Sequence, residues 1–132
     1  MEKLKLSVTL PATPKRIYDA WLNGKEHSAF IGDRATASTK VKGKFMAWDG
    51  YITGVNIDLK EGKKIVQAWR STEFPEDALD SILEIKLAPK ASGKTTLTLT
   101  HINIPKGQGK KYKGGWKESY LDPMKKYFAS KK

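Results

Sequence analysis

Six short segments of alternating polar and apolar residues follow one another between residues 35 and 104, and they constrain the fold more than any other feature. Alternation with a period of two is typical of β-strands that bury one face. Turn residues separate the segments, and the pair Asp49-Gly50 between two of them indicates a β-hairpin. Short turns join strands only in antiparallel pairs, so the sequence predicts an antiparallel sheet. The expected strands cover residues 35–39, 44–48, 51–59, 65–72, 81–88 and 95–104.

The last of these segments is the most regular, and it contains a histidine on its apolar face. Leu97, Leu99 and His101 share that face. We expect His101 to face the interior, because a register slip of one residue would expose both leucines. The same alternation in the third segment predicts that one face carries Tyr51, Thr53, Val55, Ile57 and Leu59.

A further strand and a pair of helices are expected before this series. Residues 3–10 alternate as a strand does, and Thr13-Pro14 then has the character of a helix start, with Thr as the N-cap and Pro in the first turn. Asn23-Gly24 ends this helix. A second, short helical turn is expected around residues 26–31, and His27 within it is expected on the solvent-exposed surface.

The C-terminal segment 115–128 has the pattern of one long amphipathic helix, with lysines opposite its apolar side. Pro123 lies inside the pattern. Because proline has no N–H to donate, we expect a kink near residues 119–122. The apolar side chains recur at three- and four-residue spacing and are Trp116, Tyr120, Leu121, Met124, Tyr127 and Phe128.

These elements together predict an α+β fold. A curved antiparallel sheet of about seven strands grips the long C-terminal helix on its concave face, and a short helix pair follows the first strand. A chain of 132 residues, 39% of them hydrophobic, has the size of one ordinary domain. We therefore expect a single domain over residues 1–132.

The net charge of +11 is spread evenly along the chain. Residues 1–66 contain 12 basic and 7 acidic residues, and residues 67–132 contain 13 and 7. Only three bases are arginine, the residue that reads guanine and phosphate with a bidentate fork, so no specific nucleic-acid binding is expected. The local exception is the segment 106–117, which has five lysines and no acid.

Cysteine is absent, which excludes disulfides and thiolate nucleophiles. The first ten residues, MEKLKLSVTL, lack the hydrophobic core of a signal peptide. The longest apolar run is four residues, so membrane insertion is not expected. The expected location is the cytoplasm.

Residue types that support catalysis or metal binding are sparse. The two histidines do not stand at a metal-ligand spacing, so no metal site is predicted. The fragment Gly107-Gln108-Gly109-Lys110 lacks the full spacing of a phosphate-binding loop. We therefore predict no catalytic residue and no cofactor.

A small-molecule pocket has more support. A curved sheet closed by one helix encloses a space, and incomplete filling of that space would leave an apolar pocket with a few polar groups. Ordinary core packing is the competing interpretation for each candidate. The candidate lining residues are Phe30, Trp48, Tyr51, Trp69, His101, Trp116, Tyr120 and Met124.

Several segments, in this order and spacing, carry a family resemblance. Residues 10–21, Leu-Pro-Ala-Thr-Pro-Lys-Arg-Ile-Tyr-Asp-Ala-Trp, resemble the strand-to-helix entry of START-like (SRPBCC) helix-grip domains. The other segments are Val-Gln-Ala-Trp-Arg at 66–70, Phe74-Pro75, Leu-Thr-Leu-Thr-His-Ile-Asn-Ile-Pro at 97–105, and Gly115-Trp116 with Tyr120. They are similar to the C-terminal domain of activator of heat-shock-protein-90 ATPase homologues.

The resemblance implies a helix-grip fold and a superfamily whose members bind lipids, hydrophobic metabolites or hormones in the grip cavity, with cyclase-type chemistry in some. In the two-domain activators, a separate N-terminal domain makes the main chaperone contact and stimulates the ATPase. This chain begins at the first strand of the other domain, so a stand-alone domain is expected.

Three functional hypotheses follow. The first is a module that binds a hydrophobic or amphipathic small molecule between the sheet and the C-terminal helix. The second is a stress-related, co-chaperone-like interaction domain without a ligand, whose partner is a chaperone. The third is an enzyme that uses His101. Fold alone does not choose among them, and the oligomeric state stays open.

Overall fold

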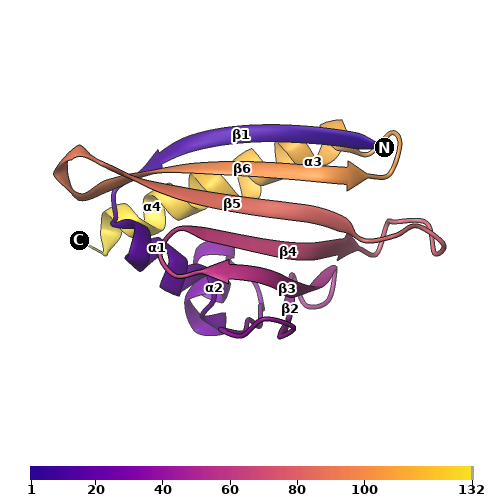
Figure 1. The fold of residues 1–132 in the computed structure, drawn as a ribbon, viewed down its shortest axis with the longest axis horizontal. Helices are drawn as coiled ribbons and strands as arrows, with labels where there is room; N and C mark the ends of the chain where they lie inside the picture. The colour runs from indigo at the N-terminus through magenta and orange to yellow at the C-terminus, as the bar shows by residue number, and fades with distance from the viewer. Residues whose placement is uncertain (132) are drawn as a thin grey trace.

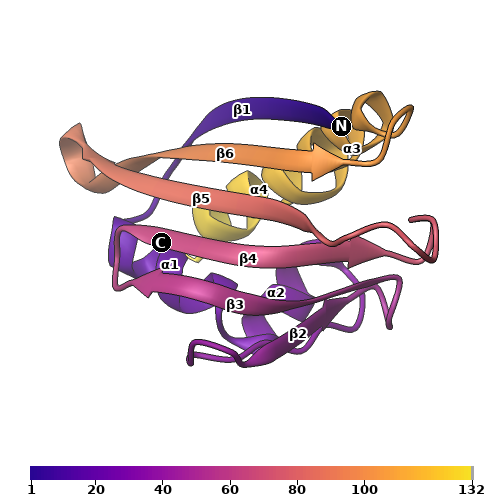
Figure 2. The same cartoon turned by 45° about the vertical axis from the view of Figure 1, so that its right-hand side comes forward.

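The computed structural model describes residues 1–131, in which one antiparallel sheet carries helices on one face (Figures 1 and 2). Within these residues the sheet has six strands in the order β1-β6-β5-β4-β3-β2, and every neighbouring pair is antiparallel. The first strand therefore pairs with the last one. The strands are β1 (Glu2–Leu10), β2 (Lys44–Ala47), β3 (Ile52–Lys60), β4 (Lys64–Ser71), β5 (Ser81–Lys90) and β6 (Lys94–Ile104).

The antiparallel sheet is confirmed, but the predicted strand at residues 35–39 is not formed. That segment makes a single bridge, between Thr36 and Met46. It carries only small and weakly apolar side chains, so its burial offers little free energy to a strand. Asn56 holds this loop instead, because its Nδ2 donates to the carbonyl oxygen of Ser38 at 2.8 Å.

The faces of β3 agree with the prediction only in part. Ile52 and Asn56 are buried, whereas Thr53 and Ile57 are exposed. A register shift directly after Asn56 interrupts the alternation. Asn56 tolerates burial because the Nε2 of Gln67 donates to its Oδ1 at 2.9 Å. Thr53, Val55 and Ile57 share one face, the outer one, as predicted, whereas Leu59, beyond the register shift, pairs with buried Ile65 and packs against the core.

The helix pair after β1 is confirmed. α1 (Pro14–Trp21) begins after Thr13, whose side chain accepts from the backbone N–H of Arg16 at 3.3 Å. α2 (Gly24–Ile31) begins after Asn23, whose side chain caps the first turn in the same way. Each helix start thus carries its own capping residue in the sequence.

The C-terminal helix is confirmed, but it begins earlier and contains an irregular stretch. α3 (Gly109–Gly115) leads into the π-helical element η2 (Trp116–Leu121) and then into α4 (Asp122–Ser130). Pro123 lies in the first turn of α4. A kink was predicted near residues 119–122, and the structure has π-helical turns over Trp116–Leu121, because Pro123 cannot donate an α-helical hydrogen bond.

The core lies between the sheet and the helices. Figures 1 and 2 show α3 and α4 running along one face of the sheet, with α1 and α2 on the same side. Leu97 and Leu99 of β6 and Met124 of α4 are completely buried. His101 is completely buried too, which confirms that it faces the interior. Within residues 1–131, no helix has the length and apolar character that crossing a bilayer requires.

Candidate functional site

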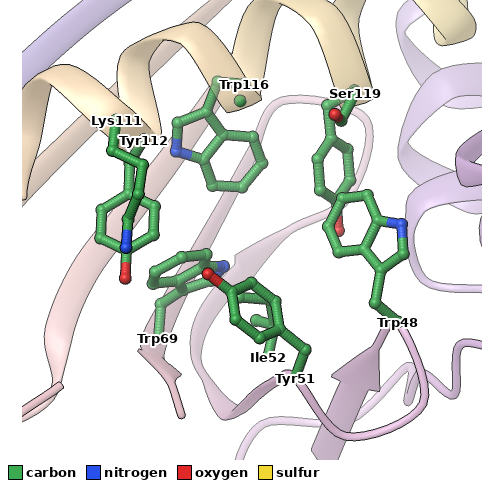
Figure 3. A pocket seen from close by; sticks show the side chains of 10 residues that line it. Trp48, Tyr51, Ile52, Trp69, Lys111, Tyr112, Trp116 and Ser119 are labelled. Atoms are coloured by element: carbon green, nitrogen blue, oxygen red, sulfur yellow. The ribbon is translucent and has the colours of Figure 1, made fainter. Parts of the chain in front are cut away.

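A cleft of about 340 Å³ opens between the C-terminal helix and the end of the sheet near the β2–β3 turn. Figure 3 shows Trp116 and Trp69 on opposite sides of the space, with Lys111 and Tyr112 at one end and Trp48 at the other. Its walls are almost entirely apolar. The lining residues are Trp48, Tyr51, Ile52, Trp69, Lys111, Tyr112, Gly115, Trp116, Ser119 and Tyr120.

Three aromatic side chains on regular secondary structure face this space. Trp69 lies on the buried face of β4, which alternates buried and half-buried residues along its whole length. Trp116 and Tyr120 lie four residues apart in the π-helical element, so both face the sheet. Their ring centroids are 4.6 Å apart, and Trp69 lies 5.7 Å from Trp116. These rings pack against one another and form a rigid wall.

Trp48 enters the cleft from a strained turn. Its φ angle is 49°, a left-handed conformation that a bulky side chain rarely adopts, and Asp49 and Gly50 also have positive φ. The backbone N–H of Tyr51 closes the turn by donating to the carbonyl oxygen of Trp48 at 3.1 Å. The Trp48 ring packs edge-on to the ring of Tyr120, with 5.0 Å between their centroids. Strain of this kind persists only where the surrounding contacts hold it.

A hydrogen-bonded rim closes one side of the cleft. The Nζ of Lys111 donates to a carboxylate oxygen of Glu73 at 2.5 Å, and the Tyr51 hydroxyl donates to the other oxygen. The bond from Lys111 and then that from Tyr51 lower the pKa of Glu73, so its carboxylate is charged at neutral pH. Burial, followed by the bond to Glu73, raises the pKa of the Tyr51 hydroxyl, which therefore stays protonated.

Five of the eight candidate residues come together in this cleft, and three do not. The five are Trp48, Tyr51, Trp69, Trp116 and Tyr120. Phe30 is buried beside Trp21, at 6.2 Å between ring centroids, and Met124 is buried on α4. Their side chains fill the core rather than the cleft.

His101 lies behind the wall of the cleft, in a closed chain of hydrogen bonds. The indole N–H of Trp116 donates to its Nδ1 at 3.0 Å, so the ring proton must be on Nε2. Nε2 then donates to the Oγ of Ser81 at 2.7 Å, and that hydroxyl donates to the carbonyl oxygen of Trp69 at 2.7 Å. Burial lowers the pKa of His101 to about 3.

These hydrogen bonds give His101 a structural role. The imidazole joins β4, β5, β6 and the C-terminal helix, and both of its nitrogens are occupied. This series of hydrogen bonds ends at the backbone carbonyl oxygen of Trp69, so it does not activate a nucleophile. His101 does not line the cleft, so the hypothesis of an enzyme that uses His101 has no support from the geometry.

The expectation that His27 is exposed was wrong, because only 5% of this residue is accessible. Its Nδ1 donates to the carbonyl oxygen of Trp21 at 2.9 Å, and its Nε2 accepts from the Tyr120 hydroxyl at 2.8 Å. Burial lowers the pKa of His27 to about 4, although the bond to Trp21 opposes the shift. His27 therefore anchors Tyr120, one of the rings that line the cleft.

Five lining residues were missed by sequence reasoning. Lys111 and Tyr112 belong to a turn of helix whose Gly- and Lys-rich sequence gave no helical signal. Tyr112 is fixed there because its hydroxyl bonds to the Oγ of Ser71 at 2.5 Å and donates to the Oε1 of Gln108 at 2.8 Å. The candidates were chosen as large aromatic side chains, with His101 and Met124, at positions expected to face inward, so small and basic residues escaped notice. The missed residues are Ile52, Lys111, Tyr112, Gly115 and Ser119.

The chemical capacity of the site is that of a binding pocket. The polar side chains of the rim bond to one another, and the walls are aromatic. Among residues 1–131, no group of three or more His, Asp or Glu side chains lies close enough together to hold a metal ion. An apolar wall with a few polar groups at its edge is the usual form of a small-molecule site.

An antiparallel sheet around a long C-terminal helix, with a helix pair after the first strand, defines a helix-grip domain of the START-like class. The chain belongs to the family described as activator of Hsp90 ATPase homolog 1-like protein, whose family model matches residues 11–129.

Named relatives and solved structures agree with this assignment. The chain is 31% identical over 126 residues to an activator of 90 kDa heat shock protein ATPase homolog from Dictyostelium discoideum, covering 96% of this chain and 33% of the relative. It is 29% identical to homolog 1 from Homo sapiens, with 96% and 37% covered. The chain thus spans about a third of the length of these relatives.

The crystal structure of an Hsp90 activator from Plasmodium falciparum has the same fold. The TM-score is 0.88, the sequence identity is 23%, and the superposition covers 98% of this chain and 97% of that one.

Proposed function

We propose that the protein binds an apolar or amphipathic small molecule in the cleft between the sheet and the C-terminal helix. The observation that carries this proposal is the gap of about 340 Å³ among six aromatic side chains. Other surface clefts of this molecule measure about 330–470 Å³, and what distinguishes this one is its almost wholly aromatic and apolar lining. Known ligand pockets measure roughly 300–1,000 Å³, and the lower end suits a ligand of about two rings.

The rigidity of the walls supports the same proposal. Tyr120 is held by His27, and Trp116 is held by His101, through buried hydrogen bonds. Neither ring can collapse into the gap without leaving a buried polar atom unpaired, which costs about 1–3 kcal/mol. Preformed walls of this kind lower the entropy cost of binding.

Filling the cleft from its mouth tests the proposal. Ser119 is exposed and lines the cleft, so Ser119→Trp should place an indole in the space without disturbing the core. The matched control is Lys126→Trp, at an exposed position outside the cleft. Titration with the fluorescent neutral compound N-phenylnaphthylamine should give saturable binding to the wild type and the control. Ser119→Trp should abolish it. Absence of binding to the wild type, or equal binding to all three proteins, contradicts the proposal.

Native mass spectrometry of freshly purified protein complements this titration. A small molecule that is retained from the cell would add its mass to the 14.8 kDa chain. Loss of that added mass in Ser119→Trp would assign it to the cleft.

A second candidate function is contact with Hsp90, which family membership favours. The chain's charge of +11 suits an acidic partner surface. The test measures Hsp90 binding and ATPase turnover with and without this chain, over a series of salt concentrations. Contacts made by exposed lysines should weaken steeply with salt. Binding without any salt dependence, or none at all, argues against this second function.

We also propose that the chain acts as one domain over residues 1–132 and in the cytoplasm. The size of the chain supports the first statement, and its lack of cysteine agrees with the second.

A further inference from the structure

Hydrogen-bond donors dominate the polar groups around the cleft. Among residues 1–131, the indole N–H of Trp69 donates to no protein atom, although only 3% of the residue is accessible. In these residues, every fully enclosed side-chain nitrogen or oxygen has a hydrogen-bond partner. The unpaired N–H of Trp69 is therefore not fully enclosed and must reach open space. The open space that Trp69 borders is the cleft. The Lys111 ammonium and the protonated Tyr51 hydroxyl add two more donors at the rim.

Two of these donors already bond to a carboxylate of the protein itself. Glu73 accepts from Lys111 and from Tyr51, and its side chain is about half exposed. The backbone of Glu73 is fixed separately, because its N–H donates to Ser71 Oγ at 3.1 Å and its carbonyl oxygen accepts from Gln108 Nε2 at 3.0 Å. The Glu73 carboxylate can therefore rotate into solvent while the backbone stays in place.

We propose that the cleft is specific for a flat apolar molecule that carries an acidic group, and that this group replaces the Glu73 carboxylate at Lys111 and Tyr51. The inference rests on the proposed function and adds the chemical class of the ligand. The rings of the ligand lie in the space that Trp48, Trp69 and Tyr120 border, against the wall that the packed rings of Trp69 and Trp116 form (Figure 3).

Electrostatics favours an anion over a cation in this site. Lys111 is the charged residue that lines the cleft, and once Glu73 has turned into solvent its ammonium attracts an anionic ligand and repels a cationic one. The net charge of +11 attracts anions to the surface as a whole. Glu73 and the bound acid cannot both lie against Lys111 and Tyr51, because two carboxylates at this distance repel each other. Displacement of Glu73 follows from this repulsion.

Two fluorescent compounds with the same ring system test the inference. Anilinonaphthalenesulfonate carries an anionic sulfonate, and N-phenylnaphthylamine lacks it. The wild type should bind the sulfonate more tightly than the neutral compound. Lys111→Met should weaken sulfonate binding about tenfold, the loss expected for one charge-assisted contact, and should leave the neutral compound within about twofold.

Glu73→Gln should act in the opposite direction. It removes the competing carboxylate, so the affinity for the sulfonate should rise about fivefold, equivalent to about 1 kcal/mol. Two matched controls address nonspecific charge effects. Lys113→Met removes an exposed lysine of the same helix outside the cleft, and Glu76→Gln removes an exposed acid of the same loop. Both controls should leave the affinities for both compounds unchanged. Near-UV circular dichroism verifies that each variant is folded.

The possible outcomes separate this inference from the proposed function. If the neutral compound binds in the cleft but the sulfonate binds no more tightly, the inference is wrong and the proposed function stands. If Lys111→Met and Lys113→Met weaken sulfonate binding equally, the inference is also wrong, because this result would show attraction by surface charge alone. If neither compound binds the wild type, the proposed function fails and the inference fails with it.

Discussion

The two buried histidines are neutral because burial lowers their pKa values, and their hydrogen bonds fix different tautomers. His101 accepts at Nδ1 from the indole N–H of Trp116, which has no way of accepting a proton in return. His27 donates from Nδ1 to a backbone carbonyl oxygen. The structure therefore assigns the proton to Nε2 in His101 and to Nδ1 in His27. Long-range nitrogen–carbon NMR spectra distinguish these tautomers, and identical tautomers would contradict the assignment.

These histidines should make the protein less stable as the pH falls. Their pKa values, about 3 for His101 and about 4 for His27, lie below the unfolded value of 6.5. Protons therefore bind the unfolded chain first, and stability present above pH 6.5 is lost as the pH falls towards 4 and 3. At pH 5 each histidine should cost about 2 kcal/mol relative to pH 7.5. Urea unfolding at both pH values measures this loss, and titration of either histidine near 6.5 contradicts it.

Two glycines provide a matched test of close packing. A Cβ on Gly54 of β3 would lie 1.9 Å from the carbonyl oxygen of Ala68 and 2.5 Å from the Phe45 ring. Gly54→Ala should therefore destabilise the protein by about 3 kcal/mol or more. A Cβ on Gly114 of α3 would meet no atom within 4 Å. Gly114→Ala should stabilise it by about 0.5–1 kcal/mol. Thermal unfolding compares the two, and equal effects would contradict this account.

At the scale of the elements, sequence patterns predicted a helix or strand correctly where local residue preference and burial favour the same element. The capped helix pair, the strands of the sheet and the aromatic C-terminal helix all carry such patterns, and all were predicted. The segment 35–39 was wrongly predicted as a strand, and α3 was not predicted at all. In both cases the residues that hold the segment in place are distant in sequence. Asn56 holds the first, and the Glu2 carboxylate accepts from the backbone N–H groups of Gly107 and Gly109 at the start of α3. Short-range periodicity carries no information on such contacts.

The C-terminal helix should be essential to the fold. Deletion of residues 115–132 removes five buried side chains, each of which contributes roughly 1.5–3 kcal/mol when buried. Their sum is comparable to or larger than a typical total stability of about 5–15 kcal/mol. The deleted protein should lack a cooperative unfolding transition, whereas Lys125→Ala, at an exposed position, should keep it. A truncated chain that still unfolds cooperatively would rule this out. Residue 132 itself lies outside the described structure. The five side chains are Trp116, Tyr120, Leu121, Met124 and Phe128.

At the scale of the whole molecule, the basic charge predicts weak and nonspecific attraction to nucleic acids. The lysines are dispersed, and Arg16 and Arg70, two of the three arginines, are engaged with Glu26 and with the carbonyl oxygens of the 75–78 loop. DNA binding should be independent of sequence and absent at moderate salt. Fluorescence anisotropy with two unrelated duplexes across a salt series tests this. Sequence-dependent affinity at physiological salt would contradict it.

The position of the cleft could be predicted from the sequence only in outline. The aromatic content and the sheet-and-helix order indicated a space between the two layers, and Trp69, Trp116 and Tyr120 followed from periodicity. Whether an aromatic side chain fills the core or borders a gap depends on packing between elements that are far apart in sequence. Phe30 and Tyr120 illustrate this, because both are buried and only Tyr120 lines the cleft.

The central claim is that the cleft binds a small apolar molecule, and the indole N–H signals of the four tryptophans test it directly. Trp48, Trp69 and Trp116 line the cleft, whereas Trp21 is buried outside it and donates to Gln67 at 3.4 Å. In a nitrogen–proton correlation spectrum titrated with N-phenylnaphthylamine, the Trp69 and Trp116 signals should move and saturate. The Trp21 signal should move less, because its ring stacks on Tyr120 at 5.3 Å between centroids but does not line the cleft. Unchanged signals from all four residues, or an equal movement of Trp21, would contradict the claim.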